Sequence, residues 1–141
     1  MEKENDPINP KHYKSLFELK DNETIAVTRQ LDFCAGNYYK YLARLYKKDD
    51  PVQDFQKARW YAKDWVQHHY ERDAHGLLIN PCGVRAAIAF DFIQPPEEGT
   101  ELYDRYELMR IVTQPLIDES RWRVMLLNYE HKYLIDKEGI K

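Results

Sequence analysis

Five side chains that suit an anionic ligand recur at helical spacing between residues 37 and 48. At about 100° per residue they form a stripe beside the apolar face of one predicted helix. That apolar face consists of Leu31, Tyr38, Leu42 and Leu45. The stripe beside it consists of Asn37, Lys40, Tyr41, Arg44 and Lys48. A solvated helix face usually mixes charges of both signs at four-residue steps, whereas this stripe contains cations and no acid.

A second polar stripe follows after a short turn. It consists of Asp54, Lys57, Tyr61, Asp64 and His68, next to the apolar face of a second predicted helix. Two helices joined by so short a turn lie antiparallel. The two stripes can therefore border one groove.

The residue types in these stripes favour a phosphorylated small molecule as ligand. An arginine guanidinium offers a planar pair of donors to phosphate oxygens, and a lysine supplies a mobile point charge. A tyrosine ring offers a flat surface for a base. Gly36, directly before Asn37, would let a ligand or another backbone approach closely. The same spacing fits an ordinary polar surface or a polar contact between subunits, and the residues alone leave these interpretations open.

The first half of the chain must hold these stripes on an antiparallel helical hairpin. The apolar periodicity predicts a first helix over about residues 23–48 and a second over about residues 51–73. Asp50 is a good N-cap for the second helix, and Pro51 suits its first position. Residues 1–22 are predicted to form an irregular arm, since Pro7 and Pro10 disfavour helix at the residues before them.

The second half adds further helices to a mainly α fold. Thr100 is a candidate N-cap for a helix that reaches about Thr113, and a last helix is predicted over residues 119–136. Residues 84–93 alternate as a short strand would, although their alanines also permit a helix. We predict a single domain, 1–141, in which residues 23–75 form the hairpin and residues 76–141 form a C-terminal extension of unknown type.

Composition narrows the class of protein. A length of 141 residues suits one domain, and a net charge of −3 argues against broad nucleic-acid binding. The first residues lack the apolar core of a signal peptide, no apolar stretch could span a membrane, and two cysteines form no disulfide framework. A soluble intracellular protein is expected. The aromatic content of 13% predicts rings buried between subunits of a homo-oligomer.

Four short motifs occur in order along the first half of the chain. The first is Asn9, Pro10, His12 and Tyr13, and the second is Glu23 and Ile25. The third is Gly36, Asn37, Lys40, Tyr41, Arg44 and Lys48, and the fourth is Asp54, Lys57, Ala58 and Tyr61. With these motifs, residues 7–66 resemble a family of small tailed-phage proteins typified by a nucleotide kinase that lacks a Walker motif. The second half has no counterpart in that pattern.

The resemblance implies a phage early protein that handles nucleotides in the host cytoplasm as an oligomer. The family's known activity is phosphoryl transfer to deoxynucleoside monophosphates, which implies a nucleoside triphosphate as donor. It implies that His12 and Asp54 are catalytic, with one or the other orienting the acceptor. The ligand contacts that it implies are Tyr13, Asn37, Lys40, Tyr41, Arg44, Lys48, Lys57 and Tyr61.

No metal site is predicted. His68, His69, His75 and Cys82 lack the spacing of known zinc motifs.

Two other functions fit the same residues. A binding protein that sequesters a nucleotide immune signal of the host, of the cyclic ADP-ribose or cyclic oligonucleotide type, needs the same cations and rings but no catalytic group. A purely structural helical oligomer would instead pair the polar stripes between subunits. That third interpretation predicts that Arg44→Ala disrupts assembly without changing any nucleotide affinity.

Overall fold

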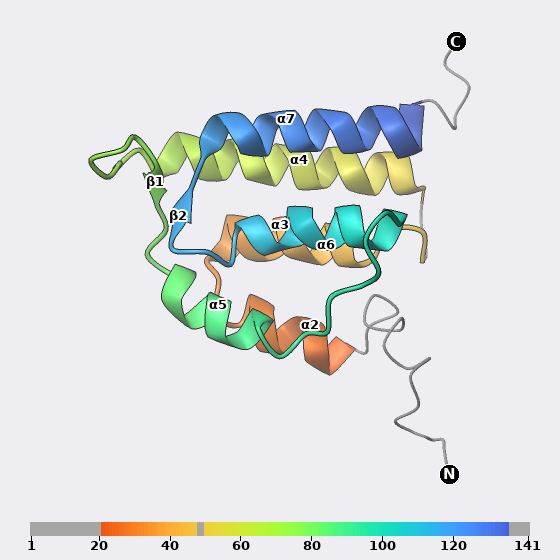
Figure 1. Cartoon of the computed structure of the whole chain (residues 1–141), viewed down its shortest axis with the longest axis horizontal. Helices are drawn as coiled ribbons and strands as arrows, with labels where there is room; N and C mark the ends of the chain where they lie inside the picture. Colours follow the sequence, from red (N-terminus) through yellow and green to blue (C-terminus); the bar gives the residue numbers. More distant parts are fainter. Residues whose placement is uncertain (1–20, 48–49, 136–141) are drawn as a thin grey trace.

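The computed structural model describes residues 21–47 and 50–135, and within these ranges the chain is mainly helical (Figure 1). The helices are α2 (Asp21–Thr28), α3 (Phe33–Ala43), α4 (Pro51–His68), α5 (Gly83–Phe90), α6 (Glu101–Ile111), α7 (Glu119–Tyr129) and the π-helical segment η1 (Glu130–Ile135). Two short strands, β1 (Leu78–Ile79) and β2 (Leu116–Ile117), pair antiparallel. The predicted mainly α fold is confirmed. No helix in the described ranges is long and apolar enough to cross a bilayer.

Helices α3 and α4 form the antiparallel hairpin that the apolar periodicity predicts (Figure 1). The Asp50 side chain accepts a hydrogen bond from the Val52 backbone N–H at 2.9 Å, and Pro51 occupies the first turn. The cap and the proline therefore start α4 where the sequence places its beginning.

The single helix predicted over residues 23–48 is wrong, because the chain turns between α2 and α3. Asp32 is the N-cap of α3, and its side chain accepts from the Ala35 backbone N–H at 2.9 Å. The same carboxylate accepts from the indole N–H of Trp65 on α4 at 3.0 Å, so a tertiary contact supports the new helix start. Helix α4 in turn ends at His68, before the predicted residue 73.

The second half follows the predicted order of elements, with one alternative resolved. Thr100 caps α6 by accepting from the Tyr103 backbone N–H at 3.1 Å. Residues 84–93 lie mostly in helix α5, so the strand alternative is wrong there. Ala86 and Phe90, one helical turn apart, are buried while Val84 and Ile88 are exposed, so the alternating apolar residues divide between two faces of a helix. The strands lie instead on either side of α5 and α6.

Aromatic side chains join α6 and α7 to the hairpin in one hydrophobic core. The buried Tyr38 hydroxyl of α3 donates to the Leu108 carbonyl at 2.7 Å and accepts from the Trp122 indole N–H at 3.0 Å. Phe55 of α4 stacks on Tyr129 of α7 with ring centroids 5.2 Å apart. These contacts hold the second half against the helices that carry the polar stripes.

The C-terminal end of α3 depends on a buried arginine of α6. Arg105 is 4% exposed and donates to the backbone carbonyls of Leu42 at 3.0 Å and of Ala43 and Leu45 at 3.4 Å. The last carbonyls of a helix have no partner within the helix, so these bonds satisfy buried backbone groups at the end of α3. The Leu42 carbonyl also accepts from the Leu45 backbone N–H at 3.3 Å. Glu101 accepts from the same guanidinium at 2.7 and 3.1 Å and balances its charge.

We expect Arg105→Ala to lower the free energy of unfolding by about 3 kcal/mol, because it removes the side-chain donor of the buried Ala43 and Leu45 carbonyls and the cationic partner of Glu101. Urea denaturation followed by circular dichroism measures this change. Arg110→Ala, at an exposed position of α6, is the matched control and should change stability by no more than about 0.5 kcal/mol. Equal effects of the two substitutions would contradict the capping role of Arg105.

Candidate functional site

The two predicted stripes meet at a pair of tyrosine rings. Tyr41 of α3 and Tyr61 of α4 stack with centroids 6.0 Å apart and planes 12° from parallel. Both rings are partly buried and pack against the hydrophobic core. We call this pair, together with the cations Lys40, Arg44 and Lys57 that surround Tyr41, the Tyr41 site.

Three cations lie close to one ring of this site. The Lys40 ammonium is 4.9 Å, the Arg44 guanidinium carbon 5.1 Å and the Lys57 ammonium 5.4 Å from the Tyr41 ring centroid. Each cation–ring contact at an exposed site contributes only about 0.5–1 kcal/mol, so the ring does not remove the repulsion between like charges. Neither lysine has an ion-pair partner among the described residues. An anion placed here would neutralise this charge.

The buried Asp54 of α4 forms an ion pair with Arg44 of the Tyr41 site. Its carboxylate Oδ2 lies 3.4 Å from Nε of Arg44, and the side chain is 0% exposed. Its other oxygen, Oδ1, is buried and has no hydrogen-bond partner among the described residues. Because the carboxylate has no exposed surface, it can hold Arg44 in place. In this arrangement it does not reach a substrate that would accept a phosphoryl group. It offsets one of the three positive charges.

The open groove next to the Tyr41 site lies between α2 and α3, not between the two stripes. It has a volume of about 700 Å³, and its lining includes Gly36, Asn37, Lys40 and Arg44. The cations Lys40 and Arg44 therefore border this groove, whereas the rings of Tyr41 and Tyr61 and the cation Lys57 lie outside its lining. The expected groove between the stripes is absent from the described residues, because the stacked Tyr41 and Tyr61 rings fill the line where α3 and α4 meet.

The remaining predicted residues fall into two groups. His12, Tyr13 and Lys48 lie outside the described residues. Asn37 donates its side-chain N–H to the Phe33 carbonyl at 2.9 Å while it lines the groove.

Asp64 and His68, the last two residues of the α4 stripe, make contacts outside the Tyr41 site. Asp64 accepts from the Cys34 thiol at 2.9 Å and lies 3.7 Å from the His68 ring nitrogen. Within the described part of the chain, no group of three histidine, cysteine or acidic side chains could hold a metal ion.

Two exposed aromatic rings lie beside Tyr61 that the residue spacing in the sequence did not predict as part of the site. Phe33, 73% exposed, and Trp60, 60% exposed, each meet Tyr61 edge-on, with centroids 5.9 and 5.2 Å from its ring. Trp60 follows Lys57 by three residues and therefore lies on the same helix face, which was the available signal. Phe33 begins α3 and comes near Tyr61 only because the chain turns before it.

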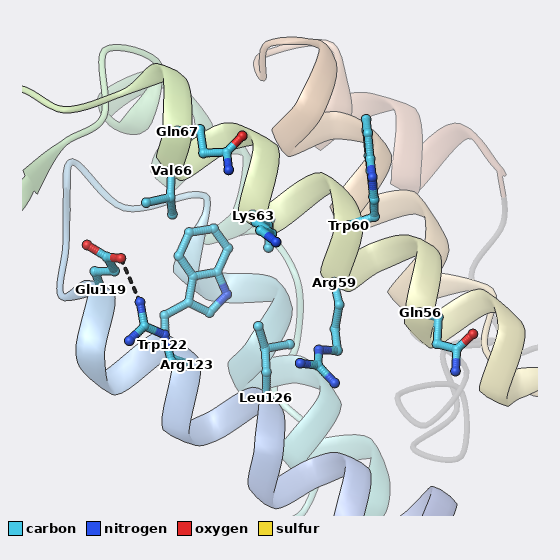
Figure 2. Close-up of a pocket in the computed structure, with 11 residues that line it drawn as sticks. Gln56, Arg59, Trp60, Lys63, Val66, Gln67, Glu119, Trp122, Arg123 and Leu126 are labelled. Atoms are coloured by element: carbon cyan, nitrogen blue, oxygen red, sulfur yellow. Dashed lines mark hydrogen bonds and ion pairs between the residues drawn. The ribbon is translucent and has the colours of Figure 1, made fainter.

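A second groove lies between α4 and α7 and has a volume of about 570 Å³ (Figure 2). Trp122 and Leu126 of α7 face Val66 of α4 across it. Two of its cations are already paired, since Arg123 contacts Glu119 at 2.8 Å and Arg59 contacts Glu130 at 2.6 Å. Sequence spacing could not reveal this groove, because its walls are far apart in the chain.

Comparison with known proteins finds similarity to a protein family in the first half of the chain. A family described only as "protein of unknown function (DUF3310)" matches residues 8–63, fewer than half of the chain. The matched region contains every residue of the Tyr41 site and ends before the second half. No curated protein and no solved structure matches the chain. The comparisons therefore mark the region in which the site lies without naming an activity.

Gly36→Ala tests whether a neighbouring part of the chain approaches Gly36 too closely for a side chain. Gly36 lies in the first turn of α3, and an added Cβ would come no closer than 3.8 Å to its neighbours, which is ordinary contact. We expect the free energy of unfolding to rise by up to about 1 kcal/mol, because alanine favours helix over glycine. Thermal unfolding measures this change. A loss of stability would show that the space at Gly36 is tighter than the structure indicates.

Cys34 should react slowly with alkylating agents. Burial and the hydrogen bond to the Asp64 carboxylate raise the pKa of its thiol to about 12, so almost no thiolate is present at neutral pH. In a Cys82→Ser background we expect labelling at mildly alkaline pH to be about a hundredfold slower, or more, than for an unperturbed cysteine. Asp64→Asn should speed it by lowering the pKa. Rapid labelling of Cys34, followed by mass spectrometry, would refute the Cys34–Asp64 contact.

Proposed function

We propose that the Tyr41 site binds the phosphate groups of a nucleotide and that the protein is a nucleotide kinase without a Walker motif. The observation that carries the proposal is the position of Lys40, Arg44 and Lys57, whose cationic groups lie 4.9–5.4 Å from one tyrosine ring. Arginine provides paired donors for phosphate oxygens, and the lysines provide charge. The adjoining groove of about 700 Å³ leaves the site open on the side of Lys40 and Arg44.

Phosphoryl transfer suits a site that offers charge and positioning rather than a base. The bond between the γ-phosphorus of a nucleoside triphosphate and its bridging oxygen breaks, and a phosphate oxygen of a deoxynucleoside monophosphate forms the new bond. The products are two diphosphates. The acceptor oxygen carries no proton near neutral pH, since the second pKa of a phosphate monoester is about 6. The main requirement is therefore stabilisation of charge, which Lys40, Arg44 and Lys57 would supply.

Capture of a nucleotide without chemistry is the second candidate. It is favoured by the burial of Asp54, the one predicted catalytic residue within the described ranges. In that function the cations and rings hold a nucleotide signal, and Asp54 serves only to position Arg44. The two candidates share the binding site and differ in whether the ligand leaves it altered.

One experiment separates the two candidates. The protein is incubated with nucleoside mono-, di- and triphosphates, cyclic dinucleotides and cyclic ADP-ribose, and the free fraction is chromatographed before and after the protein is denatured by heat. A kinase yields new nucleotide species, whereas a sequestering protein returns its ligand unchanged only after heating. We expect Lys57→Ala to weaken nucleotide binding by about tenfold or more, as the loss of a charge-assisted contact predicts.

Lys132→Ala is the matched control, because Lys132 is an exposed lysine of η1 that lines neither groove, and it should leave binding unchanged. Arg44→Ala also tests the site, but it leaves the buried Asp54 carboxylate without its arginine partner and can lower stability. Retention of no nucleotide, combined with a changed oligomeric state in Arg44→Ala, would overturn the proposal in favour of a structural assembly.

A further inference from the structure

Trp60 differs from the other two tryptophans of the chain. Trp65 is 0% and Trp122 is 2% exposed, and both belong to the core. Trp60 is 60% exposed although it has the largest apolar surface of any side-chain type. Its indole projects away from Trp122 and Leu126, so it stands at the rim of the groove between α4 and α7 and takes no part in their packing (Figure 2).

The position of Trp60 connects it to the Tyr41 site. Trp60 and Lys57 are three residues apart and share a face of α4. The Trp60 ring meets Tyr61 edge-on at 5.2 Å, and Tyr61 stacks on Tyr41 at 6.0 Å. A continuous aromatic row therefore leads from an exposed indole to the ring that three cations surround.

This row presents two different chemistries to a ligand. Its Tyr41 end carries the positive charge that attracts phosphate, and its Trp60 end offers the flat apolar face of an exposed indole. A molecule that has an anionic part and a planar aromatic part could engage both ends at once. Stacking on the indole would bury apolar surface that is otherwise exposed to water.

We propose that Trp60 is the base-stacking residue of the Tyr41 site, so that the nucleobase lies on the indole while the phosphate lies among Lys40, Arg44 and Lys57. This inference rests on the proposed function and adds the orientation of the ligand. It assigns recognition of the base to α4, within the region of family similarity.

Tryptophan fluorescence tests the proposal directly, because Trp60 is the exposed one of the three tryptophans. The protein is titrated with each of the four deoxynucleoside monophosphates, and 2-deoxyribose 5-phosphate serves as a probe without a base. We expect at least one nucleotide to quench the emission, while the probe without a base leaves it unchanged. Trp60→Phe should abolish the quenching, because the two buried tryptophans remain shielded.

Equilibrium dialysis of the same nucleotides then gives the contribution to affinity. Trp60→Ala should weaken binding at least about fivefold, as the loss of one base–aromatic stack predicts. Phe92→Ala is the matched control, because Phe92 is 87% exposed and lies just beyond the end of α5, far from α4 in the sequence.

The outcomes distinguish this inference from the proposed function. Binding that is lost in Lys57→Ala but unchanged in Trp60→Ala would overturn the stacking role and leave the nucleotide site in place. Absence of binding by the unaltered protein would overturn both. A change of oligomeric state in Trp60→Ala, seen by gel filtration without a change in affinity, would assign the indole to a subunit contact instead.

Discussion

The end of α3 is buried, and the rest of the structure depends on how its carbonyls are satisfied. Arg105 reaches from α6 to the carbonyls of Leu42, Ala43 and Leu45, which flank Arg44 in the chain. A buried guanidinium is tolerated because it is fully hydrogen-bonded and paired with Glu101. The second half of the chain thereby determines where the last turn of α3 lies, and with it the side chains of Tyr41 and Arg44. The candidate site is held in place by residues that do not belong to it.

The hairpin separates its polar and apolar surfaces with aromatic rings. Tyr38 faces the core and binds Leu108 and Trp122, whereas Tyr41, one turn later on the adjoining face, meets Tyr61. Tyrosine suits both positions, because its ring packs like a hydrocarbon while its hydroxyl needs a polar partner. These tyrosines therefore line the boundary between core and surface on the hairpin. Exposed rings occur at the same boundary, where Phe33 and Trp60 flank Tyr61.

Charge is distributed unevenly over this framework. Arg105, Arg59, Arg72 and Arg123 each have an acidic partner. Around Tyr41, Asp54 contacts Arg44, and the two lysines lack an acid among the described residues. The chain as a whole is acidic, with a net charge of −3, so this concentration of positive charge is local.

The sequence by itself determined the local features of the protein. The Asp50–Pro51 and Thr100 caps are interactions within a few residues, and the structure confirms the helices that begin at them. Periodicity likewise predicted the antiparallel pairing of α3 and α4, although not the break between α2 and α3. Tertiary structure decided what depends on distant partners. Asp32 begins a new helix with support from Trp65, and residues 83–90 form a helix in which Ala86 and Phe90 turn inward. The open groove lies next to α2, while stacked tyrosines occupy the line between the two stripes. Each of these outcomes depends on contacts between residues remote in sequence. Local sequence patterns do not predict the energy of such contacts.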